Sequence, residues 1–169
     1  MRITKSIVLL LACAFFSFPV LAQKYAVPEN YGFNKQADYK KYAPDVVKCA
    51  AWLEKNTMED ENPKYNETVN FISEWATGCD LVDFNRSVRI ESAFSECSKL
   101  GIYVTAGWAK NAIESDYKAT KLDNYVAGIQ FALQAYKKNK NLHCGESIRE
   151  LIKMDNRGKL RQWVDEQMQ

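Results

Sequence analysis

The residues of this chain that could do chemistry are few, and histidine is the scarcest of them. His143 is the single histidine in 169 residues, so the chain cannot supply two histidine ligands or an H-E-x-x-H zinc motif. The chain has no G-x-S-x-G elbow, no glycine-rich phosphate loop and no twelve-residue calcium loop. We therefore predict no catalytic, cofactor-binding or metal-ligating residue, and an enzyme is the less favoured interpretation.

Aromatic side chains offer a second chemistry, which is ligand binding. Residues 103–112, YVTAGWAKNA, place a glycine beside a tryptophan in a stretch with helical spacing. Small residues around Trp108 are typical of two helices in close contact, with the indole filling the adjacent gap. We predict that Trp108 is buried against a helix over 122–136, with Gly107 and Gly128 allowing close approach. A ligand cleft lined by Tyr103, Trp108 and Tyr125 is the alternative, and it stays open.

Cysteine use indicates an oxidising compartment. Four cysteines follow the leader described below, and none forms the close C-x2-C pair that is usual in structural zinc sites. We therefore predict two disulfides, although four cysteines allow three pairings. A hairpin of the first two helices would bring Cys49 near Cys79. The predicted pairs are Cys49–Cys79 and Cys97–Cys144.

The first 22 residues have the pattern of a cleaved secretory signal. Arg2 and Lys5 precede a short apolar run, and Val20-Leu21-Ala22 provides the small residues that signal peptidase reads. We expect cleavage before Gln23 and export to the periplasm or the cell exterior, with no transmembrane segment left after cleavage. The alternative is a lipoprotein signal with Cys13 as the lipidated residue.

The charge balance argues against a nucleic-acid partner. The chain has 23 Lys+Arg and 21 Asp+Glu, and the leader holds two of the bases and none of the acids, so the mature chain has 21 of each. Nucleic-acid-binding proteins carry a basic excess. We therefore expect a protein or a small ligand of the cell envelope as the partner. Two sequons, at Asn66 and Asn85, matter only in a eukaryotic secretory pathway.

The spacing of apolar residues predicts an all-α fold. Residues 23–42 are polar and aromatic and indicate an extended N-terminal arm, and residues 43–169 form one helical domain. Pro44 fits the first turn of the first helix, and Gly101 is a candidate break between two helices. Residues 87–90 alternate and could be a short extended piece. We predict a compact bundle of about six or seven helices over 44–56, 63–78, 91–100, 102–114, 122–136, 144–154 and 160–164.

Several segments resemble known groups of exported proteins. GWAKNAIES, YVAGIQFALQAYKKNK, LIKM…GKLRQWV and YKKYAPDVVKCAAWLEK resemble small exported helical proteins of Bacteroidetes-type bacteria, and the match covers most of residues 39–164. That resemblance implies an exported helical domain and assigns no site. YVAGI and LHCGESIRELI are similar to periplasmic immunity proteins that neutralise type VI secretion amidases. Those proteins usually carry a cysteine before the tyrosine, which is missing here, and a proline where this chain has Gly145.

These observations predict an exported, non-enzymatic binding or structural protein. One alternative is a periplasmic immunity or inhibitor protein that neutralises a secreted effector. Another is a carboxylate-dependent hydrolase with a helical cleft, because the chain has 21 acidic residues whose separation in space the sequence does not define.

Overall fold

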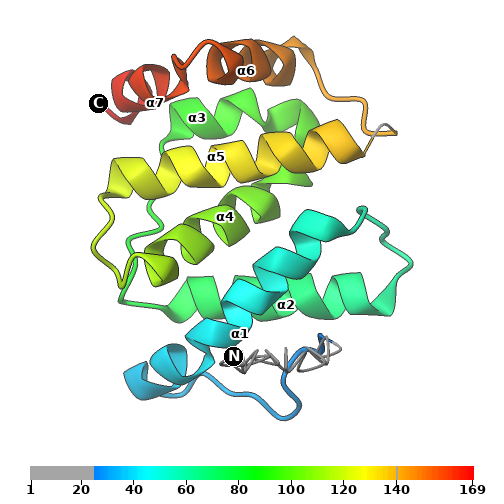
Figure 1. The fold of residues 1–169 in the computed structure, drawn as a ribbon, viewed down its shortest axis with the longest axis vertical. Helices are drawn as coiled ribbons and strands as arrows, with labels where there is room; N and C mark the ends of the chain where they lie inside the picture. The colour runs from blue at the N-terminus through cyan, green and yellow to red at the C-terminus, as the bar shows by residue number, and fades with distance from the viewer. Residues whose placement is uncertain (1–24, 140) are drawn as a thin grey trace, which may run out of the picture.

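A computed structural model describes residues 25–139 and 141–169, and this part of the chain is helical without a strand (Figure 1). The predicted leader over residues 1–22, with its cleavage site and Cys13, lies outside the described residues. The prediction of an all-α fold is confirmed for the described part. Its elements are α1 (Gln36–Lys55), α2 (Pro63–Gly78), α3 (Val88–Ala93), the 3-10 turn η1 (Ser95–Cys97), α4 (Leu100–Glu114), α5 (Lys121–Lys138), α6 (Glu146–Asn156) and α7 (Leu160–Met168).

The helices form three layers, and the pair of α4 and α5 is the middle one. α4 and α5 lie side by side in the middle and make the most extensive helix–helix contact of the described residues. α1 and α2 cover the α4 side, while α6 and α7 cover the α5 side together with α3 (Figure 1). The surface of α2 therefore lies at the opposite end of the molecule from α6 and α7.

The contact between α4 and α5 depends on two glycines. A Cβ atom on Gly107 would fall within contact distance of the Phe131 Cβ and 3.0 Å from the Ala127 carbonyl oxygen. A Cβ atom on Gly128 would lie 2.5 Å from the carbonyl oxygen of Val104. Beside these glycines Trp108 is fully buried, as predicted, and its ring centroid lies 4.6 Å from that of Tyr125.

The first helix begins earlier than predicted. α1 starts at Gln36, so the extended arm ends at Lys35 rather than at residue 42, and Pro44 lies inside the helix. The Asp38 carboxylate caps the helix by accepting hydrogen bonds from the backbone N–H groups of Asn34 and Lys35, at 3.0 and 3.1 Å. Pro44 has no N–H group, so one carbonyl in the preceding turn of the helix lacks its hydrogen-bond donor. Because Pro44 is exposed, this carbonyl lies on the water-facing side of the helix, where solvent can bind it.

Two further local predictions are wrong. Residues 87–90 lead into α3 rather than forming an extended piece, because the Ser87 carbonyl accepts the Glu91 N–H at 2.9 Å. Gly101 lies within α4 and does not break it. Both errors come from treating a single residue or a four-residue pattern as stronger than the helical run around it.

One of the two predicted disulfides is present. Cys97 and Cys144 are bonded, with their Cα atoms 5.2 Å apart, and this bridge joins η1 to the segment before α6. The predicted bridge between Cys49 and Cys79 is wrong, because both residues are buried free cysteines.

The register of α1 against α2 explains why the second bridge is missing. The Trp75 indole N–H donates to the Tyr39 carbonyl at 2.9 Å, so the end of α2 packs beside the start of α1. Cys79 therefore lies near Tyr39. Cys49 is ten residues further along α1, which corresponds to about 15 Å of helix rise.

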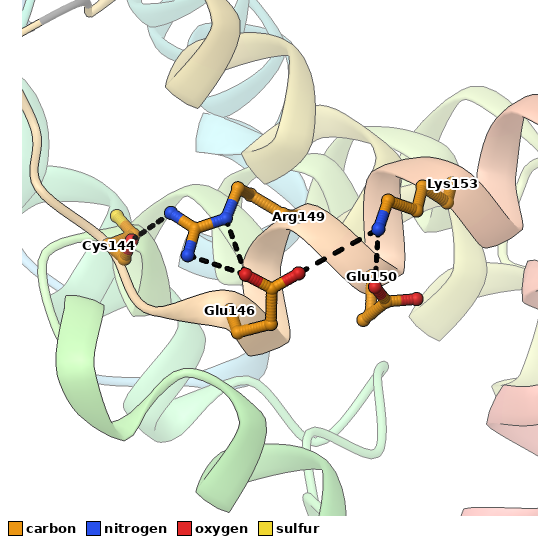
Figure 2. Close-up of polar contacts among 5 residues, drawn as sticks. All are labelled: Cys144, Glu146, Arg149, Glu150 and Lys153. Carbon is orange, nitrogen blue, oxygen red and sulfur yellow. Dashed lines mark hydrogen bonds and ion pairs between the residues drawn. The ribbon is translucent and has the colours of Figure 1, made fainter.

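Exposed ion pairs follow the disulfide on the first two turns of α6. Arg149 donates from Nε and Nη2 to Glu146 at 2.8 and 2.6 Å, and from Nη1 to the Cys144 carbonyl at 3.4 Å (Figure 2). Lys153 binds the carboxylates of Glu150 and Glu146 at 2.6 and 3.7 Å. The Arg149 guanidinium lowers the pKa of the Glu146 carboxyl below its usual value. These side chains satisfy one another, and we interpret them as helix-stabilising pairs next to the bridge.

Replacing Gly107 by alanine should destabilise the fold by about 1–3 kcal/mol, because the added methyl group overpacks the contact between α4 and α5. Gly101→Ala in the same helix is the matched control. A Cβ atom on Gly101 would lie 3.7 Å from Arg86 Nη1, an ordinary contact distance, so this variant should gain up to about 1 kcal/mol of stability from the higher helix propensity of alanine. Urea unfolding of both variants measures the difference. Equal stability of the two variants would contradict the close-contact interpretation.

Peptide mapping without reduction should recover a linked Cys97–Cys144 peptide and two free thiols that react slowly at neutral pH until the protein is denatured. Replacing both bridge cysteines by alanine should lower the free energy of unfolding by about 4 kcal/mol, because the bridge spans a sequence separation of 47 residues. Cys79→Ala removes a buried thiol without removing a bridge and serves as the control. A linked Cys49–Cys79 peptide would show that the register described above is incorrect.

Candidate functional site

The three aromatic residues predicted as a candidate cleft lie in the core instead. Tyr103, Trp108 and Tyr125 are all fully buried. Their polar atoms have no hydrogen-bond partner among the described residues. Burial raises the pKa of the Tyr125 phenol to about 12, and it raises that of the Tyr103 phenol further. These side chains pack α4 against α5 and do not line a surface cleft, so the site must be sought elsewhere.

The outward face of α2 lies between two grooves. Four of its exposed residues recur at helical spacing, and we call them the α2 surface: Glu67, Asn70, Glu74 and Thr77. The opposite face of the helix is buried through Phe71, Ile72 and Trp75. Burial of that apolar face fixes the direction in which the polar side chains point.

The N-terminal arm forms the first groove by folding back onto α2. This arm groove has a volume of about 430 Å³ and is lined by Ala26, Val27, Pro28, Glu29, Tyr31, Glu67, Asn70 and Glu74. The Tyr31 ring packs edge-on against Phe71, with centroids 4.7 Å apart. Its hydroxyl donates to the Glu74 carboxylate at 3.1 Å. The groove therefore combines three carboxylates with an apolar wall.

Tyr25 anchors the arm between α1 and α2. Its hydroxyl donates to the Cys49 sulfur at 2.9 Å and lies 3.0 Å from the Thr68 hydroxyl. Its ring centroid is 5.9 Å from that of Trp52, and the Lys64 ammonium lies 4.7 Å above the Tyr25 ring. Burial raises the pKa of the Cys49 thiol to about 11. Cys49 therefore holds the arm as a neutral thiol and is a poor nucleophile.

Acidic residues are concentrated on α2 and its flanking loops. Residues 56–83 contain seven acids and one base. Asp60 and Asp83 are paired with Lys99 and Lys121 from other segments, but the four glutamates have no ion-pair partner among the described residues. The loop before α2 adds an open hollow of about 620 Å³ lined by Glu59, Asp60, Glu61 and Asn62. The acids of the segment are Glu59, Asp60, Glu61, Glu67, Glu74, Asp80 and Asp83, and the base is Lys64.

A second groove lies on the other side of the α2 surface. It has a volume of about 280 Å³ and is lined by Ser73, Ala76, Thr77, Phe84, Arg86 and Thr105, and we call it the Arg86 groove. Neither groove could be predicted from the sequence, because each combines residues from segments far apart in the chain. The uneven distribution of acids was the one signal in the sequence that pointed to this end of the molecule.

Two other properties of the described residues bear on the site. No group of three or more histidine, cysteine or acidic side chains within the ranges 25–139 and 141–169 is placed to hold a metal ion, and His143 is exposed. Within the same ranges, none of the helices combines the length and the apolar character needed to cross a bilayer.

Replacing Tyr25 by alanine should expose the Cys49 thiol and raise its alkylation rate by about tenfold, because the side chain that contacts the sulfur is removed. Tyr25→Phe keeps the ring and serves as the control. In the native protein the reaction should accelerate as the pH rises from about 9 toward about 11, where Cys49 ionises. Over the same interval the free energy of unfolding should fall, because the unfolded chain loses this proton first. An alkylation rate that is the same for all three proteins would contradict the anchoring role of Tyr25.

Comparison of the chain with protein-family models, with curated proteins and with solved structures finds no match. The resemblances to exported helical proteins and to immunity proteins therefore stay predictions.

Proposed function

We propose that this is an exported, non-enzymatic binding protein that recognises a basic partner through the α2 surface and the arm groove. The observation that carries the proposal is the concentration of unpaired glutamates around a groove of about 430 Å³. Export is supported by the signal-like leader in the sequence and by the Cys97–Cys144 bridge, since disulfides persist mainly in oxidising compartments.

The distribution of charge favours a cationic protein as the partner. Unpaired carboxylates on one face produce a negative potential that attracts a basic surface and speeds its association. The arm groove could receive a single lysine or arginine side chain, whose methylene groups would contact Val27 and Pro28 while its charge met Glu67 or Glu74. The rest of the contact would spread over the α2 surface.

A periplasmic immunity or inhibitor protein is a specific form of this proposal. The α2 surface supports it, because an inhibitor acts by covering a site on its target and needs no catalytic group of its own. The target would then be a secreted effector with a basic rim. The hydrolase alternative would use the carboxylates of the arm groove or of the hollow before α2.

The proposal can be tested by reversing charges on the two ends of the molecule. The mature protein is used to capture envelope proteins, and the affinity for each purified candidate is measured. Glu67→Lys/Glu74→Lys should weaken binding by at least about tenfold, which is about 1.4 kcal/mol. Asp165→Lys/Glu166→Lys on α7 is the matched control and should leave the affinity unchanged.

The salt dependence provides a second readout. Raising the ionic strength from about 50 mM to about 300 mM should weaken the wild-type interaction and reduce the difference between the variants. A partner whose affinity responds equally to both charge reversals, or to neither, would refute the α2 surface as the binding face. Thermal melts of each variant establish that the fold is retained.

A further inference from the structure

We propose that the Arg86 groove is a binding site for a neutral saccharide. This inference does not rest on the proposed function, because it concerns a different groove, which shares only Thr77 with the α2 surface. The groove brings together an arginine, three hydroxyl-bearing side chains and an aromatic ring. Small-molecule sites combine apolar and aromatic walls with a few polar groups that fix the orientation of the ligand.

Arg86 is held in place by the surrounding helices rather than moving freely in solvent. Its Nη1 donates to both oxygens of the Glu91 carboxylate at 3.2 and 3.3 Å, and its Nη2 donates to the Gly101 carbonyl at 3.3 Å and to the Thr105 hydroxyl. An arginine has five N–H donors in a fixed plane. These bonds use Nη1 and Nη2, the Nε–H has no hydrogen-bond partner among the described residues, and Arg86 lines the groove.

Phe84 supplies the aromatic wall and is itself fixed by packing. Its ring centroid lies 5.6 Å from that of Trp108 and 6.2 Å from that of Trp75. Phe84 is only partly buried, and it lines the groove. A rigid, partly exposed ring can pack against the apolar C–H face of a sugar, whose hydroxyl groups would bind Arg86 and the Ser73 hydroxyl. The Thr77 hydroxyl donates to the Ser73 carbonyl at 2.8 Å, so toward a sugar it acts as an acceptor.

The surrounding charges favour a neutral ligand over an anionic one. The charge of Arg86 is already balanced by Glu91. The adjacent α2 surface carries Glu67 and Glu74, which would repel an anion. The volume of about 280 Å³ is just below the range of about 300–1,000 Å³ usual for small-molecule pockets, and this suits a single sugar ring.

Chemical-shift titration of the isotope-labelled mature protein, with its disulfide intact, tests the proposal directly. The probes are methyl glucoside, N-acetylglucosamine and glucuronate, each taken to high millimolar concentration. At least one neutral sugar should give saturable shifts centred on the backbone amides of Phe84, Arg86 and Thr105. Glucuronate should bind more weakly than the neutral sugar, because it carries a carboxylate.

Variants separate binding from folding. Phe84→Leu keeps an apolar side chain against the two tryptophans and should weaken sugar binding by about tenfold, because it removes the aromatic face. Thr77→Val changes an exposed hydroxyl and should weaken binding without changing the melting temperature. Ser98→Ala, at an exposed position outside the groove, is the control and should bind as the wild type does.

Three results would overturn the proposal. The first is the absence of saturable shifts with both neutral sugars. The second is tighter binding of glucuronate than of the neutral sugars, which would identify an anion site. The third is a set of shifts that lies outside the groove or that persists unchanged in both Phe84→Leu and Thr77→Val.

Discussion

The close contact between α4 and α5 is the constraint on which the other helices depend. At Gly107 and Gly128 the backbone of each helix occupies space that a side chain would otherwise fill. Glycine within a helix is less favourable than alanine by about 1 kcal/mol, and the burial of Trp108 and Tyr125 beside the contact offsets this. Because α1 and α2 pack on one member of the pair and α6 and α7 on the other, moving α4 away from α5 would disturb both outer layers.

This architecture also explains why the two grooves and the exposed glutamates gather around α2. The central pair uses the large aromatic residues for packing, and α2 is left with one apolar face toward the core and one polar face toward water. The arm and the segment before α3 then border the polar face on its two sides. A helix backed by a tight core holds its carboxylates in fixed positions, which is a better basis for recognition than a loop.

Patterns within single elements were readable from the sequence, whereas most relations between elements were not. The spacing of apolar residues predicted the α5 helix, and the small residues around Trp108 predicted its burial. The Cys97–Cys144 bridge was also predicted correctly. The start of α1 could not, because Pro44 outweighed the helical spacing of Tyr39 and Ala43, and a proline on an exposed helical face is tolerated. The failed cysteine pair and the two grooves depend on the register of packed segments, which local composition does not determine.

The two unpaired cysteines bear on how the chain acquires its bridge. In an oxidising compartment any thiolate can attack an existing disulfide, so four cysteines allow exchange among several cross-linked isomers. In the folded protein Cys49 and Cys79 are buried, and burial raises the pKa of both thiols. Packing therefore suppresses scrambling once the helices have assembled. Before assembly no such protection exists, and oxidation that outruns the docking of α1 on α2 would trap mispaired chains. Correct maturation is thus a competition between helix packing and thiol oxidation, in which a disulfide isomerase would favour the native isomer.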